Sequence, residues 1–205
     1  WVQGFMAGEV MYEYFHVNNP DAAAKSEKVI FIGTKSIDPQ MQKYTGMEQS
    51  ITSHEEFDLV YTYDGLEDTI DAGYDQLENA LTAEPDARYI MMQNCIPTLG
   101  ASNYIAAMPG ANLEDYNIFL SGEDQTTRDL YEMTLNGEAC VRGTVQSDKN
   151  EGEYMQDITR MVFNNEVFKD YELIMTFAAI TVGWDFDYTS DDVDMSLCPF
   201  DYAKK

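Results

Sequence analysis

The stretch R-Y-I-M-M-Q-N-C-I-P-T-L-G-A-S-N-Y-I-A-A-M, Arg88 to Met108, joins a short apolar strand to a helix and decides the fold class. Arg88 to Met92 is an apolar run typical of a strand that is buried on both faces. Pro97 to Met108 has the small and apolar residues of a packed helix, and Gln93 and Asn94 lie between the two elements. A strand that leads into a helix is the repeating unit of α/β folds.

The same unit recurs on both sides of this stretch. Further strands are predicted over 28–33, 57–63, 116–120 and 140–145, and further helices over 3–17, 38–53, 66–81, 126–135 and 151–163. The strands are short, apolar and too far apart in the chain to form hairpins. This pattern predicts a parallel sheet with helices on both of its faces.

The rhythm changes after Tyr171. Residues 173–184 are apolar and rich in β-branched side chains, whereas residues 185–194 are acidic. We expect this tail to leave the main sheet, which divides the chain into a domain over 1–170 and an appendage over 171–205. The chain also opens at Trp1 within a predicted helix, so we expect it to be a piece of a longer protein.

The charge of the chain excludes several classes of partner. Among 205 residues, 37 Asp and Glu face 12 Lys and Arg, which gives a formal net charge of -25. Such a surface repels nucleic acid and anionic membranes. No cofactor is predicted, and no metal is predicted because the three cysteines lack the spacing of a zinc site. We expect Cys95 and Cys140 to be buried and Cys198 to be exposed.

Polar residues follow four of the predicted strands. They are Gly33 to Lys35, Gln93 and Asn94, Ser121 to Asp124, and Gln146 to Asp148. In an open parallel sheet, ligands bind beyond the carboxyl ends of the strands. Amides and carboxylates next to aromatic strands are suited to a polyol, because they offer paired acceptors and donors to hydroxyl groups. Asn94 and Asp124 each precede a helix, so a role as a helix cap alone stays open for either.

The sequence holds no recognisable catalytic constellation. It has no G-x-S-x-G, H-E-x-x-H or C-x-x-C motif, and no phosphate-binding glycine loop follows the first strand. His16 and His54 lie at predicted helix ends, where a solvated or capping role is expected. These features favour a binding module over an enzyme.

Six motifs together resemble one known family. Residues 91–101, M-M-Q-N-C-I-P-T-L-G-A, are similar to the "QND…ALGA" segment of the ribose- and galactose-type periplasmic sugar-binding proteins. The other five motifs occur in the family's order and are G-F-M-A-G at 4–8, K-Y-T-G at 43–46, L-x-x-x-P-D at 81–86, L-S-G-E-D-Q-T at 120–126 and Y-T-S-D-D-V-D at 188–194. The resemblance covers nearly the whole chain. It implies a flavodoxin-like three-layer sandwich with a parallel sheet, the carboxy-terminal lobe of a type I solute-binding protein.

The resemblance also implies ligand-binding residues. Asn94 and Asp124 fall on ligand-binding positions of the family, and Lys43 falls where the family usually has arginine. Gln146 lies near the last binding position, with Ser147 and Asp148 as competitors. Two departures bear on the choice of ligand, because Cys95 replaces the usual aspartate after Asn94 and lysine cannot form the two-pronged contact of arginine. Glu123 competes with Asp124 for its role.

The function implied by the resemblance is that of the extracytoplasmic solute-binding component of an ABC importer. A small sugar would be held between this lobe and an amino-terminal lobe, on which the tail over 171–205 would pack, and the closed form would dock on a membrane permease. Three alternatives stay open: a sensory ectodomain of a receptor, the effector domain of a LacI-like repressor, and an enzyme of flavodoxin-like fold. A receptor would continue into a membrane helix, and a repressor would carry a helix-turn-helix upstream.

Overall fold

The computed structural model of the chain describes residues 1–122, 124–147, 160 and 177–200. Within them lies a six-stranded sheet in the order β2-β1-β3-β4-β5-β6. The strands are β1 (Glu27–Gly33), β2 (Phe57–Asp64), β3 (Tyr89–Met92), β4 (Asn117–Ser121), β5 (Val141–Ser147) and β6 (Phe177–Thr181). The first five strands are parallel, as predicted, and β6 is antiparallel to β5.

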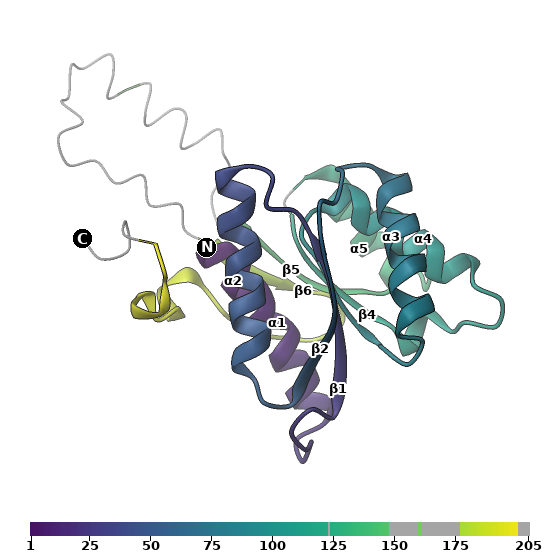
Figure 1. Cartoon of the computed structure of the whole chain (residues 1–205), viewed down its shortest axis with the longest axis horizontal. Helices are drawn as coiled ribbons and strands as arrows, with labels where there is room; N and C mark the ends of the chain where they lie inside the picture. The colour runs from purple at the N-terminus through teal and green to yellow at the C-terminus, as the bar shows by residue number, and fades with distance from the viewer. Residues whose placement is uncertain (123, 148–159, 161–176, 201–205) are drawn as a thin grey trace.

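Helices cover both faces of this sheet (Figure 1). The helices are α1 (Val2–Asn18), α2 (Asp38–Ser53), α3 (Ile70–Ala83), α4 (Cys95–Ala107) and α5 (Gln125–Leu135), with short 3-10 turns at Leu113–Asp115, Ser190–Asp192 and Met195–Leu197. Helices α1 and α2 pack on one face, and α3, α4 and α5 on the other. The predicted helix over 151–163 lies almost wholly outside the described residues.

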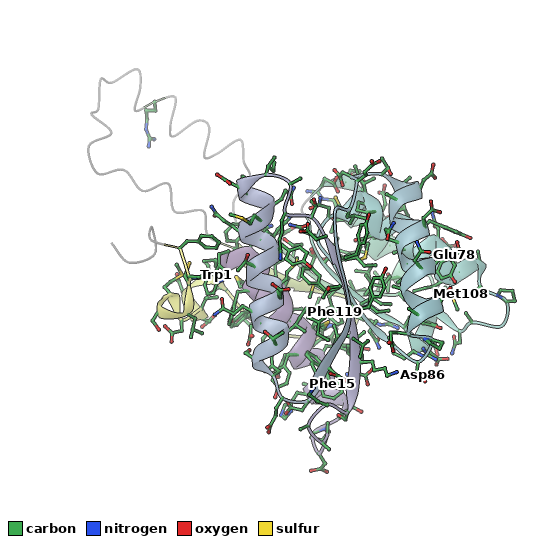
Figure 2. The ribbon with its side chains drawn as sticks, in the orientation of Figure 1. Trp1, Phe15, Glu78, Asp86, Met108 and Phe119 are labelled. Carbon is green, nitrogen blue, oxygen red and sulfur yellow. The ribbon has the colours of Figure 1, made fainter. Side chains whose placement is uncertain are left out.

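Alternation along each strand builds two separate cores. Phe31 points to the α1–α2 face, whereas its neighbours Ile30 and Ile32 point to the opposite face. The same alternation places Phe119 in the first core and Leu120 in the second. Side chains that are apolar on both faces explain why these strands read as continuous apolar runs in the sequence. Figure 2 shows Phe15 and Phe119 among the side chains that fill the interior.

One helix begins later than its apolar pattern suggests. The pattern from Leu66 onward predicts a helix, but α3 begins at Ile70 because Thr69 caps it by accepting a hydrogen bond from the backbone N–H of Ala72 at 3.1 Å. Leu66 is buried all the same, in the turn after β2. Leu66 fits the apolar spacing of the helix although it lies in the preceding turn, so the predicted helix began one turn too early.

The expectation that the tail leaves the main sheet is wrong for residues 177–181. These residues form β6 and pair with β5 from Gly143 opposite Thr181 to Ser147 opposite Phe177. An apolar strand gains hydrogen bonds and burial by covering the open edge of β5. Cys198, expected to be exposed, is buried in the α1–α2 core, because the end of the tail folds back over that face.

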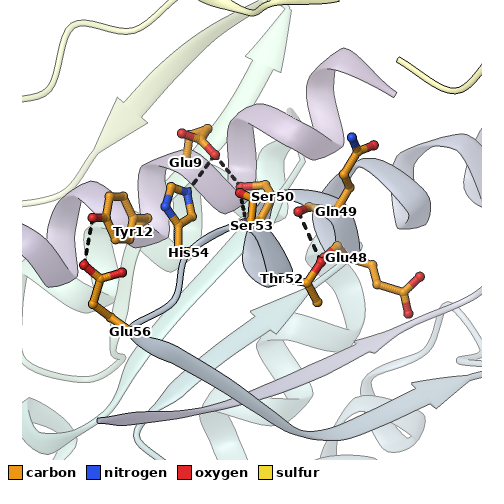
Figure 3. A network of polar contacts seen from close by, with 9 residues as sticks. All are labelled: Glu9, Tyr12, Glu48, Gln49, Ser50, Thr52, Ser53, His54 and Glu56. Atoms are coloured by element: carbon orange, nitrogen blue, oxygen red, sulfur yellow. Dashed lines mark hydrogen bonds and ion pairs between the residues drawn. The ribbon is translucent and has the colours of Figure 1, made fainter. Parts of the chain in front are cut away.

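A polar network joins α1 to the end of α2 (Figure 3). Nε2 of His54 lies 2.9 Å from a carboxylate oxygen of Glu9, which also accepts a hydrogen bond from the Ser50 hydroxyl at 2.7 Å. The ring of Tyr12 stacks on His54 with 3.5 Å between centroids, and its hydroxyl donates to Glu56. His54 occupies the C-cap position of α2, as expected, but its imidazole is largely buried between these groups and is not solvated.

Candidate functional site

A cavity of about 240 Å³ opens at the carboxyl edge of the sheet, where β3 and β4 end. Six of the residues that line it end or follow those two strands: Ser121 is the last residue of β4, and Asn94, Cys95, Ile96, Gly122 and Asp124 come after β3 or β4. Four others come from α1, from α2 and from the turn before α3: Gln3, Gln40, Lys43 and Asp68. Three predicted site residues, Lys43, Asn94 and Asp124, therefore share one cavity.

Asn94 does not act as a helix cap. It occupies the position before α4, but its side chain makes no capping hydrogen bond. Its Oδ1 instead accepts a hydrogen bond from Nζ of Lys43 at 3.0 Å, across the space between β3 and α2. Because the backbone carbonyl of Asn94 accepts from both the N–H and the hydroxyl of Thr98, the main chain is fixed while the amide faces the cavity. The alternative of capping alone is thus excluded for Asn94.

Asp124 combines two roles. Its Oδ1 caps α5 by accepting the N–H of Thr127 at 3.1 Å, and the Asp124 carboxylate also accepts a hydrogen bond from the thiol of Cys95. Partial burial first, and the neighbouring Asp124 carboxylate second, together raise the pKa of the Cys95 thiol to about 11. A capped helix start and a neutral thiol hold the Asp124 carboxylate in place at the cavity wall.

Gln93 is a brace behind the cavity and not part of its lining. The side chain is fully buried, accepts the N–H of Thr34 at 2.5 Å and donates to the backbone carbonyl of Gln40 at 2.6 Å. These two bonds tie the ends of β1 and β3 to the first turn of α2. Gly33 is required beside this brace, because an added Cβ would lie 2.6 Å from the Gln93 oxygen.

Close helix crossings position the cavity walls on both faces. A Cβ on Gly4 or Gly46 would overlap the backbone of the facing helix, so α1 and α2 touch directly next to Lys43. Gly73 and Gly100 bring α3 and α4 together in the same way, beside the start of α4 that carries Asn94. Backbone-to-backbone packing leaves the cavity side chains little freedom to shift.

Within the part of the chain that the structure describes, Gln146, Ser147 and Lys35 are predicted strand-end residues outside the lining of this cavity. Gln146 is half-buried near the end of β5, opposite Ala178 of β6, and its binding role stays a prediction. Its competitor Ser147 ends β5, whereas Asp148 and Glu123 lie outside the described residues. Lys35, after β1, lies over the ring of Tyr44 with its N–H bonded to Asp64.

Sequence reasoning missed three lining residues. Gln3 and Gln40 lie in the first turns of α1 and α2, and Asp68 lies in the turn before α3. None of the three directly follows a strand, so a search at strand ends passes over them. Gln3 reaches the site by donating to the carbonyl of Val145 at 3.3 Å, beside the end of β5. The positions of the apolar residues in α1 and α2 give no signal for such contacts.

Comparison with known proteins identifies the fold. No sequence-family profile and no curated protein matches the chain. Among solved structures, a carbohydrate transporter solute-binding protein from Agrobacterium radiobacter in complex with D-arabinose matches with a TM-score of 0.66 and 17% identity, over 87% of this chain and 58% of that one. A galactofuranose-binding protein matches with a TM-score of 0.67 and 13% identity, over 87% and 59% of the two chains.

The chain has the fold of the periplasmic sugar-binding proteins. A third neighbour, the periplasmic component of the arabinose ABC transporter from Shewanella sp. ANA-3, matches with a TM-score of 0.64 and 16% identity, over 92% of this chain and 58% of that one. The chain thus spans less than two thirds of the length of these proteins. The predicted α/β class and the resemblance are confirmed, and two of these neighbours are solute-binding components of transporters.

Two further observations concern metals and membranes. The described residues contain no group of three or more His, Cys, Asp or Glu side chains arranged to hold a metal ion. Within the same part of the chain, none of the helices combines the length and apolar character that a bilayer-spanning helix needs.

Proposed function

We propose that this chain is the carboxy-terminal lobe of an extracytoplasmic solute-binding protein that delivers a small sugar to an ABC importer. The observation that carries the proposal is the meeting of Lys43, Asn94 and Asp124 at one cavity, at the sheet edge where open α/β folds bind ligands. The solved neighbours of the same fold include proteins that hold arabinose and its furanose forms.

The chemistry of the cavity suits a hydroxylated guest. The carboxylate of Asp124 accepts hydrogen bonds from sugar hydroxyls, and the ammonium group of Lys43 donates to sugar oxygens. The Lys43–Asn94 hydrogen bond, at 3.0 Å, keeps both groups oriented before a ligand arrives. A preorganised polar wall loses less free energy on binding than side chains that must first be ordered.

Transport would proceed by closure of two lobes and without making or breaking a covalent bond. A sugar that touches both lobes stabilises the closed form through its higher affinity for that form. In this proposal the half-buried aromatic residues that follow β6 contact the amino-terminal lobe, and a membrane permease recognises the closed form. One wall of contacts alone should bind weakly, with a dissociation constant on the order of 1 mM, or about −4 kcal/mol.

Saturation-transfer NMR tests this function on the 205-residue chain with arabinose, ribose, galactose and glucose. We expect at least one of these sugars to bind saturably and weakly. Lys43→Met should abolish that signal, because it removes the charged donor and keeps the side-chain length. Lys28→Met is the matched control. Lys28 lies away from the cavity, and its Nζ pairs with the Glu84 carboxylate at a distance of 2.9 Å.

A second variant separates charge from folding. Asp124→Asn keeps a residue that caps α5 equally well and removes the negative charge from the cavity wall. We expect unchanged thermal stability and weaker sugar binding. Failure of all four sugars to bind, or tight binding by this lobe alone, would contradict the proposal.

A further inference from the structure

Two buried oxygen atoms in the cavity wall have no hydrogen-bond partner. They are Oγ of Ser121, at the end of β4, and Oε1 of Gln40, in the first turn of α2. The side chain of Ser121 is almost fully buried, with the residue 1% exposed. A buried polar atom that lacks a partner destabilises the folded state, and native proteins keep few of them.

Neighbouring hydroxyl groups at this edge of the sheet are satisfied within the chain. The hydroxyl of Thr144, on the adjacent strand, bonds both the N–H and the carbonyl of Gly122, each at 3.1 Å. The hydroxyl of Thr98 donates to the backbone of its own helix. Ser121 and Gln40 therefore differ from the polar groups around them, and both belong to residues that line the cavity.

The charges of the cavity restrict what can satisfy these two atoms. Its charged lining residues are Lys43, Asp68 and Asp124, whose formal charges sum to one negative charge. The whole chain, these three residues included, carries a formal charge of -25. An anionic guest would be repelled over the approach to the site and within it, whereas a neutral guest would not.

The chemistry of the acceptors points to the same class of guest. An amide oxygen and a carboxylate accept hydrogen bonds and cannot donate them, and a serine hydroxyl can do either. A guest that presents several O–H groups meets all of these atoms. A carboxylate on the guest would instead place acceptor against acceptor.

We propose that Ser121 and Gln40 are specificity-determining contacts, which hydrogen-bond a polyhydroxylated guest that carries no negative charge. This inference rests on the proposed function and adds to it two recognition residues and a charge rule. Without a bound guest, the two unpartnered oxygens destabilise the folded chain. A guest hydroxyl that hydrogen-bonds to them removes this penalty and so favours binding.

Ser121→Ala tests the first contact by two readouts on the 205-residue chain. With whichever neutral sugar of the arabinose, ribose, galactose and glucose panel binds best, we expect about three- to tenfold weaker binding, the loss of one hydrogen bond. The thermal midpoint should stay the same or rise, because the variant removes an unpartnered buried hydroxyl. A purely structural serine would give the opposite pair of results, lower stability with unchanged affinity.

Gln40→Met supplies a second variant of similar size that lacks the amide. We expect the same weakening of sugar binding. Ser102→Ala is the matched control. Ser102 lies on α4, away from the cavity, and its fully buried hydroxyl is next to the thiol of Cys140. Sugar affinity in this control should equal that of the unaltered chain.

Galacturonate and glucuronate test the charge rule in the same assay. Both should bind about tenfold or more weakly than the best neutral sugar. Uronate binding as tight as that of the neutral sugars overturns the inference, as does unaltered affinity in both Ser121→Ala and Gln40→Met. In either case the proposed sugar-binding function stands. If no sugar of any kind binds, the proposed function fails and this inference falls with it.

Discussion

The two faces of the sheet are built from different side chains. The face under α1 and α2 is aromatic: Phe119 packs against Tyr14 and stacks on Tyr89, with ring centroids 5.5 and 6.4 Å apart. The face under α3, α4 and α5 is mainly aliphatic, with Ile, Leu and Val residues such as Leu120 and Leu77 fully buried. The cavity opens where the two layers meet at the carboxyl edge, so both faces position it.

The tail adds to the aromatic face alone. Trp184, Phe186 and Tyr188 form a stacked row, with centroids 5.8 and 5.2 Å apart, and Trp184 reaches Tyr14 at 5.3 Å. All three are only half-buried in the described structure. The aliphatic face is closed by its own helices, whereas the aromatic face continues into the tail. One face is therefore covered by helices of this chain, whereas the other extends across the segment that we propose contacts a second lobe.

The largest expected effect comes from adjacent residues of β4 that point to opposite faces. Phe119→Ala should lower the free energy of unfolding by about 4 kcal/mol, and Leu120→Ala by about 3 kcal/mol, because the ring leaves the larger cavity. Urea unfolding measures both. Leu120→Met keeps the volume and should cost less than about 1.5 kcal/mol. Equal or reversed losses would show that the aromatic face contributes no more than the aliphatic one.

An intermediate effect compares the glycine crossings of the two faces. In an open helix, Gly→Ala stabilises by about 1 kcal/mol. Gly46→Ala and Gly100→Ala should instead each destabilise by about 1–3 kcal/mol, because the added methyl group meets the backbone of the facing helix. Thr52→Ala, at an exposed position of α2, is the control and should stay within about 0.5 kcal/mol.

Sugar binding by Gly46→Ala and Gly100→Ala also shows how each face of the sheet contributes to the cavity. Gly46 lies one helical turn from Lys43, so its substitution should weaken sugar binding by displacing that ammonium group. The same measurement on Gly100→Ala reports on Asn94 through α4. A stabilising effect of either alanine, seen in thermal unfolding, would rule out the close crossing at that face.

The smallest effect concerns the reactivity of two thiols. Burial raises the pKa of Cys95 to about 11 and that of Cys140, within the aliphatic core, to about 12. The thiolate is the reactive form, so iodoacetamide should label Cys95 slowly at pH 8 and about tenfold faster per pH unit up to its pKa. Cys140 should stay unlabelled in the folded chain.

A bound sugar should slow the labelling of Cys95, since this residue lines the cavity. Mass spectrometry of peptides identifies the labelled thiol, and Cys95→Ser is the control for background. Fast labelling that does not change above pH 8 would show that Cys95 is neither buried nor bonded to Asp124.

The sequence predicted the parallel sheet because short strands alternate with helices along the chain and lie too far apart to form hairpins. It predicted Asn94 and Asp124 because strand ends gather at one edge and because a resemblance placed both on binding positions, whereas Lys43 came from the resemblance alone. It could not predict β6, since pairing with β5 depends on which sheet edge remains open. Gln3, Gln40 and Asp68 were missed because their place in the cavity depends on how closely the helices cross.

If polar groups from separate segments converge on one sugar-binding cavity, a sugar should disturb only that edge of the sheet. Amide NMR during titration with the neutral sugar that binds best measures this. We expect shifts concentrated at Lys43, Asn94, Ser121 and Asp124, with none at the opposite edge of the sheet around Asn19 and Glu27. Shifts centred on that opposite edge, or spread evenly over the chain, would contradict this convergence.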